Sequence, residues 1–129
     1  MGLFLAACAT TLPSAVPAPI SPPQVMTQSG IVQGVGTDGI DYFKGVPYAQ
    51  PPVGDLRWEP PQAVAHWDGV RDASHYGHDC MQQPFPLDAA PLRTTPSEDC
   101  LYLNIWRPNS AATNLPVMVW IERFMFPRT

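Results

Sequence analysis

Hydrophobic and polar positions alternate most regularly between residues 101 and 106. The two faces of an extended chain there carry different residues, with Leu101, Leu103 and Ile105 on one and Tyr102, Asn104 and Trp106 on the other. This period of two predicts a strand. Residues 115–121, LPVMVWI, are apolar without alternation, as is typical of a strand covered on both faces. We therefore predict two strands here, joined by a turn-rich connection over 108–114.

A hairpin is predicted earlier in the chain. Residues 30–35 form a first strand and residues 40–43 a return strand, with Thr37-Asp38-Gly39 between them. Glycine accepts positive φ and aspartate bonds the local backbone, so both favour this turn. The stretch 34–39 also matches G-x-G-x-x-G. We reject a nucleotide site because a strand pattern and then Pro47 follow, where such a site needs a helix N-terminus.

Residues 45–61, GVPYAQPPVGDLRWEPP, hold five prolines in 17 residues, which argue against a regular helix or a central strand. The stretch also carries bulky apolar groups, namely Tyr48, Val53, Leu56 and Trp58. We therefore predict an ordered, irregular segment lying across a core. Arg57 lies among these groups and, if partly buried, needs a carboxylate partner. Residues 67–70, WDGV, predict a turn that leads into a short strand.

Composition sets the class of the chain. Its 129 residues suffice for one modest domain, and 17 prolines predict little helix. The charged share is 14% and the net charge −4. No basic patch accompanies this balance, which argues against a nucleic-acid partner.

The N-terminal residues suggest export. Residues 3–7 form an apolar run that is too short to span a bilayer, and Leu5-Ala6-Ala7-Cys8 resembles a bacterial lipobox. The alternative is a chance apolar start, since the positive charge and longer apolar stretch of a secretory signal are missing. Residues 10–23 are rich in Pro, Ala and Ser, which is typical of a tether. We predict a lipobox-like segment and tether over 1–27, with Cys8 as a lipidation site and membrane anchor of an exported, cell-envelope or secreted protein.

Cysteine and histidine positions raise two further interpretations. If Cys8 is an anchor, the even pair of Cys80 and Cys100 remains, and it could form a disulfide in an oxidising compartment. His75, His78 and Cys80 tempt a metal interpretation, but H-x-x-H-x-C has no recognised metal-site spacing. We interpret the histidines as surface residues and assign no metal.

Three segments in order carry a family resemblance. They are FKGVPYAQPPVG at 43–54 with LRW at 56–58, WDGV at 67–70, and EDCLYLNIWRP at 98–108. Together they resemble the N-terminal part of type-B carboxylesterases, a group that includes cholinesterase-like and bacterial para-nitrobenzyl esterases. The resemblance runs from about residue 28 to residue 121.

The resemblance implies an α/β-hydrolase fold, of which this chain would supply the leading β-strands, mostly β and irregular. It implies a disulfide between Cys80 and Cys100, and a buried salt bridge between Arg57 and Glu98. It also implies serine-based hydrolysis of small-molecule carboxylic esters by an intact parent, without a cofactor.

The catalytic parts of that family are missing from this sequence. No G-x-S-x-G occurs, and all three histidines precede the place of the catalytic one. Glu122 and Arg123 stand where a glycine-rich oxyanion loop would follow the strand. We therefore assign no catalytic residue. We expect an inactive, truncated remnant with an aberrant tail over 122–129 and an uncovered strand at 116–121. The alternative is a small exported lipoprotein or binding module on an esterase-derived scaffold.

Overall fold

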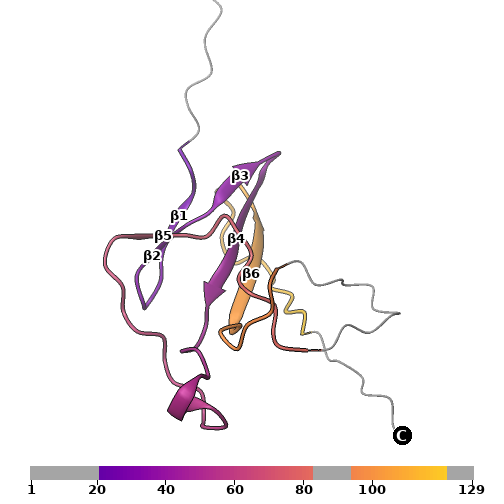
Figure 1. Ribbon diagram of the computed structural model, residues 1–129. Coiled ribbons are helices and arrows are strands. Elements are labelled where there is room, and N and C mark those ends of the chain that lie inside the picture. Colours follow the sequence, from indigo (N-terminus) through magenta and orange to yellow (C-terminus); the bar gives the residue numbers. More distant parts are fainter. Residues whose placement is uncertain (1–20, 83–93, 122–129) are drawn as a thin grey trace, which may run out of the picture.

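The computed structural model describes residues 21–82 and 94–121. These residues form six short strands and a single 3-10 turn, arranged as two three-stranded sheets (Figure 1). No α-helix occurs in the described part of the chain, in line with the helix-poor fold that the proline content predicts.

The first sheet contains β1 (Gln24–Met26), β2 (Ile31–Gln33) and β5 (Val70–Asp72), in the order β1-β2-β5. β1 pairs antiparallel with β2, and β5 pairs parallel with β2. The turn predicted before β5 is confirmed, with Gly69 at φ +74°. β1 was not predicted. It lies within the proposed tether, so ordered structure begins before residue 28.

The second sheet contains β3 (Val35–Thr37), β4 (Ile40–Pro47) and β6 (Tyr102–Pro108), in the order β3-β4-β6. The predicted turn and return strand are confirmed, with Asp38 at φ 50° and Gly39 at φ 78° leading into β4, but the first strand of the hairpin is β3, which shares only Val35 with the predicted residues 30–35. Positive φ at both positions suits a tight two-residue hairpin turn. The glycine-rich stretch therefore lies in a hairpin, and the strand β4 follows it in place of a helix.

The predicted strand over 30–35 divides at Gly34, where the chain leaves one sheet and enters the other. A Cβ at Gly34 would lie 2.3 Å from the carbonyl oxygen of Tyr42 and 2.7 Å from the ring of Phe43. Its backbone N–H donates to the carbonyl of Pro23 at 2.9 Å. A side chain at this position would therefore collide with β4, and the crossing requires glycine.

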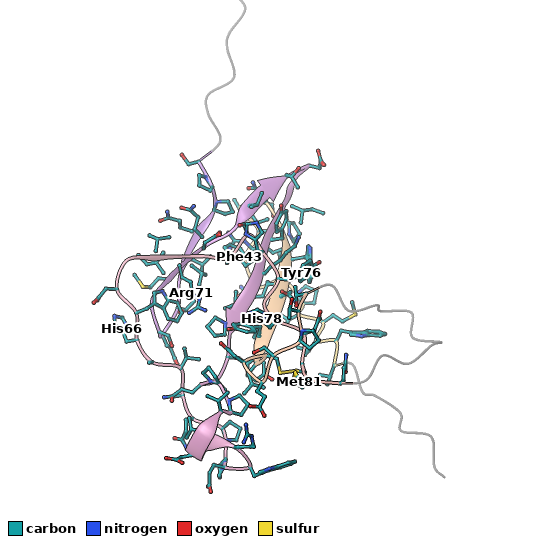
Figure 2. The ribbon with its side chains drawn as sticks, in the orientation of Figure 1. Phe43, His66, Arg71, Tyr76, His78 and Met81 are labelled. Carbon is teal, nitrogen blue, oxygen red and sulfur yellow. A yellow bond between two sulfur atoms is a disulfide. The ribbon has the colours of Figure 1, made fainter. Side chains whose placement is uncertain are left out.

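A small core fills the space between the sheets. Its buried residues come from β2, β4 and the residue that follows β5, namely Val32, Phe43, Val46 and Ala73. Phe43, labelled in Figure 2, is 2% exposed. The carboxylate of Asp41 is also buried and accepts from Arg107 on β6, with Nη2 at 3.0 Å from Oδ2.

The irregular segment predicted for residues 45–61 begins later than expected. β4 continues to Pro47, past a bulge between Phe43 and Val46 where Gly45 takes φ +63°. The Gly45 N–H, displaced from regular pairing by this bulge, donates to Asn104 Oδ1 at 2.9 Å. The expectation that bulky groups there lie across the core is also wrong for Trp58, which is 96% exposed. It follows a 3-10 turn, η1 (Gly54–Leu56).

The two strands predicted in the C-terminal half have different outcomes. The alternating stretch is confirmed as β6, shifted toward its C-terminal side. The apolar stretch 115–121 forms no strand, and residues 117–121 are 75–88% exposed. A strand needs a backbone partner, and the described residues pair none with this segment.

Candidate functional site

A disulfide joins Cys80 to Cys100, with the two Cα atoms 5.0 Å apart. Cys80 also forms an isolated parallel bridge with Ser97, whose N–H donates to the carbonyl of Asp79 at 2.8 Å. The disulfide thus lies close to the start of β6, at a point where the two ends of a loop already pair through their backbones.

Side chains hold the same loop closed. Asp79 Oδ2 accepts from Thr94 N at 2.6 Å, and Asp79 N donates to Thr94 Oγ1 at 2.7 Å. His78 Nδ1 lies 3.0 Å from the carbonyl oxygen of Thr95, where it acts as the donor because a carbonyl only accepts. These contacts and the disulfide fix residues 78–80 against residues 94–100.

Arg57 and Glu98 form a forked ion pair. Arg57 Nε donates to Glu98 Oε1 at 3.0 Å, and Nη2 donates to Oε2. The Glu98 hydrogen bond and charge raise the pKa of the Arg57 guanidinium. The pair is not buried as the resemblance implied. The two side chains are 50% and 47% exposed, because within the described residues the loop that follows η1 stands away from both sheets (Figure 1).

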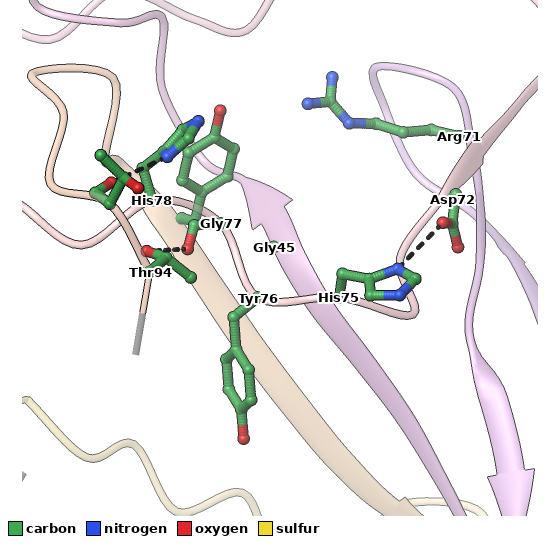
Figure 3. Close-up of a pocket in the computed structure, with 10 residues that line it drawn as sticks. Gly45, Arg71, Asp72, His75, Tyr76, Gly77, His78 and Thr94 are labelled. Atoms are coloured by element: carbon green, nitrogen blue, oxygen red, sulfur yellow. Dashed lines mark hydrogen bonds and ion pairs between the residues drawn. The ribbon is translucent and has the colours of Figure 1, made fainter. Parts of the chain in front are cut away.

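A shallow hollow of about 290 Å³ lies beside the loop (Figure 3). Its walls come from the β4 bulge, β5 and the segment after it, residues 94–95 and the start of β6, and they include Gly45, Arg71, His75, Tyr76, His78 and Tyr102. Burial and the nearby Asp99 raise the pKa of Tyr102, and Arg71 partly opposes this shift.

Ser74, His75 and Asp72 meet at the edge of this hollow. Ser74 Oγ lies 2.6 Å from His75 Nδ1, and Asp72 Oδ2 lies 3.4 Å from the same nitrogen. A catalytic triad needs the serine on one ring nitrogen and the carboxylate on the other, so that the base can take the serine proton. Here both compete for Nδ1, and the His75 side chain is 86% exposed. The cluster therefore cannot activate Ser74.

This cluster is instead a local turn. Ser74 N donates to Asp72 Oδ1 at 3.0 Å. The hydroxyl and N–H of Ser74, and then His75, lower the pKa of the Asp72 carboxyl. No G-x-S-x-G pattern surrounds Ser74, so the sequence gives no sign of a catalytic role for it. The structure brings His75 to it, but through the wrong nitrogen.

Of the remaining residues singled out from the sequence, some lie in the described part of the chain and others lie outside it. Cys80 lies in the disulfide, and the described residues contain no group of three or more His, Cys, Asp or Glu that could hold a metal. Cys8 and the tail over 122–129 lie outside the described residues. No helix in the described part of the chain has the length and apolar character needed to cross a bilayer.

Comparison with known proteins identifies one family. A model of the carboxylesterase family matches residues 21–126, which extends beyond both predicted boundaries of 28 and 121. The chain is 47% identical over 96 residues to a fumonisin B1 esterase from Sphingopyxis macrogoltabida, covering 74% of this chain and 17% of that protein. It is 46% identical over 102 residues to a para-nitrobenzyl esterase from Bacillus subtilis (strain 168), covering 76% of this chain and 20% of that protein.

Solved structures agree with this match. A PNB esterase structure superposes with a TM-score of 0.71 at 43% identity, covering 78% of this chain and 21% of that one. EstA from Aspergillus niger superposes with a TM-score of 0.61 at 32% identity, covering 73% of this chain and 18% of that one. The chain thus spans about a fifth of the length of the relatives it matches.

Proposed function

Because this chain belongs to the carboxylesterase family, we propose that it supplies the leading strands of a carboxylic ester hydrolase that acts on small-molecule esters. The observation that carries this proposal is the joint placement of the three resembling segments. WDGV leads into β5, FKGVP lies in β4, and EDCLYLNIWRP runs through the disulfide into β6 beside β4.

Within that function, the described residues have structural rather than catalytic roles. The disulfide and the Asp79–Thr94 contacts join residues 78–80 to residues 94–100, and the Arg57–Glu98 pair ties the segment after η1 to the segment that leads into β6. The sequence contains no G-x-S-x-G, and Ser74 has no correctly placed base. The 129 residues are therefore inactive toward esters when expressed alone.

Two measurements on the purified 129-residue chain test this inactivity. We expect no turnover of 4-nitrophenyl acetate above an empty-vector preparation, and no mass increase after treatment with a fluorophosphonate that labels activated serines. The Bacillus subtilis para-nitrobenzyl esterase serves as the positive control for both. Turnover that co-purifies with the chain, together with labelling of one serine, would overturn the assignment.

The disulfide also supports a proposal about location. Disulfides persist mainly in oxidising compartments, and this preference, together with the lipobox-like Leu5-Ala6-Ala7-Cys8, supports the proposal that the protein lies in the cell envelope or outside the cell. We expect the chain to incorporate labelled palmitate, and Cys8→Ala to abolish that labelling. Incorporation that persists in Cys8→Ala, or its absence from the unaltered chain, would contradict lipidation at Cys8.

A further inference from the structure

The chain contains two Asp-Gly steps, Asp38-Gly39 and Asp68-Gly69. At such a step the backbone nitrogen of the glycine can attack the carboxyl group of the aspartate, because glycine has no side chain that blocks the approach. A reaction between two groups of one chain depends on how readily the fold lets them meet in the required geometry. The two steps differ in this respect.

The Asp38-Gly39 step is held in place by its surroundings. It forms the turn between β3 and β4, which is closed by the pairing of Thr37 with Ile40. The Thr37 hydroxyl donates to Asp38 Oδ2 at 3.3 Å, and the Gly39 carbonyl accepts from the Asn109 N–H at 2.7 Å. Both the carboxylate and the glycine peptide are therefore restrained.

The Asp68-Gly69 step lacks such restraints. It ends the loop that leads from η1 to β5 (Figure 1). Within the described residues, no hydrogen bond engages the Asp68 carboxylate or the Gly69 N–H, and the carboxylate has only a long contact with His66, with Nε2 3.9 Å from Oδ1. A Cβ at Gly69 would meet no described atom within 4 Å. The nitrogen and the carboxyl carbon are therefore free to approach each other.

We propose that Asp68 is a site of spontaneous isomerisation through a cyclic imide. The Gly69 nitrogen forms a bond to the carboxyl carbon of Asp68, and the carboxyl hydroxyl leaves with the amide proton as water. Water then opens the five-membered ring at either carbonyl. Opening at the side-chain carbonyl restores aspartate, and opening at the main-chain carbonyl gives isoaspartate. The composition is unchanged, no oxidant or cofactor takes part, and the proposal does not depend on ester hydrolysis.

Isomerisation would lengthen the main chain between two residues that are fixed against β2. The Trp67 N–H donates to Ser29 O at 2.9 Å and its indole N–H donates to Ile31 O at 3.0 Å, while Val70 pairs with Ile31. An isoaspartyl linkage adds one carbon to the backbone between these anchors. Because β5 is only three residues long, we expect it to lose its pairing with β2.

Peptide mapping of the 129-residue chain after prolonged incubation near neutral pH tests the proposal, with an isoaspartyl methyltransferase to label the product. We expect isoaspartate to accumulate about tenfold faster at Asp68 than at Asp38, because the contacts of the hairpin must open before Asp38 can react. In denaturing urea those contacts are lost, so the two rates should converge. The two steps thus serve as controls for each other in one molecule.

The matched variant is Asp68→Glu. It keeps the charge, but its longer side chain would have to close a six-membered ring, which forms far more slowly. Incubated Asp68→Glu should therefore lack the signal at residue 68 and keep the slow signal at Asp38. Hydrogen exchange at Ala73, whose N–H donates to Gln33 O at 2.7 Å just after β5, measures the structural consequence. The fraction of molecules with accelerated exchange there should equal the isoaspartate fraction, and it should stay at zero in Asp68→Glu.

Four results would overturn the proposal. Absence of isoaspartate at residue 68 would show that the step does not react. Accumulation at Asp38 that equals or exceeds that at Asp68 would show that the hairpin contacts give no protection. A difference that persists in urea would assign the selectivity to neighbouring residues in the sequence and not to the fold. Unchanged exchange at Ala73 in isomerised molecules would show that β5 accommodates the longer backbone.

Discussion

Removal of the Cys80–Cys100 bridge should loosen the contacts between residues 78–80 and residues 94–100 and leave the first sheet intact. The bridge spans a sequence separation of 20. The chain-entropy relation for a closed loop of that size gives a stabilisation of roughly 3 kcal/mol. The same free energy corresponds to about a 100-fold change in an opening equilibrium.

Hydrogen exchange measures this opening directly in Cys80→Ser/Cys100→Ser. The reporting amides are Ser97, which donates to Asp79 O at 2.8 Å, and Thr94, which donates to Asp79 Oδ2 at 2.6 Å. Both lie at the foot of the loop, so their exchange should accelerate about 100-fold. The internal control is Thr27, whose amide donates to Gly30 O at 2.9 Å next to β1 and should be unaffected.

The result that refutes this reasoning is exchange at Ser97 and Thr94 within about threefold of the unaltered chain. It would mean that the Asp79–Thr94 and His78–Thr95 contacts close the loop without the disulfide. Equal acceleration at Thr27 would refute it differently, by showing that the bridge supports the whole fold.

Three further predictions concern the crossing at Gly34, the Arg57–Glu98 ion pair and the phenol of Tyr102. Gly34→Ala should destabilise the fold by about 1–3 kcal/mol in urea titrations, because its Cβ would lie 2.3 Å from Tyr42 O; an unchanged midpoint would show that the crossing has room. Arg57→Ala should leave the urea midpoint unchanged, because the pair is half-exposed, whereas a clear loss would show a buried pair. Tyr102 should ionise above pH 10 in ultraviolet titrations, so its contribution to stability is present below pH 10 and is lost as the pH rises through the raised pKa. Asp99→Asn should lower that pKa, and an unmoved value would leave burial as the cause.

The sequence predicted those elements whose conformation is determined by residues close together in the chain. The hairpin at residues 37–39 follows from two positions that need positive φ, and β6 follows from its alternation. The rejection of the glycine-rich stretch as a nucleotide site rested on the strand pattern after it, and β4 is that strand.

Features that depend on contacts distant in sequence were not predictable. β1 is three residues long and lies in a proline-rich stretch, so its only signal is its pairing with β2. Gly34 carries no local sign that Tyr42 and Phe43 approach it. Residues 115–121 have strand-like composition, yet a strand forms only where a second backbone is available. The exposure of Arg57 and Glu98 was missed for the same reason, since burial depends on what covers the pair.

The chimera that most directly tests the central claim replaces the matched N-terminal residues of the Bacillus subtilis para-nitrobenzyl esterase with residues 21–121 of this chain. If these residues are the leading strands of a carboxylesterase, the chimera should hydrolyse 4-nitrophenyl acetate within about tenfold of the parent enzyme, while the 129-residue chain alone shows no turnover. A chimera that folds but has lost activity, or turnover by the isolated chain, would contradict the account.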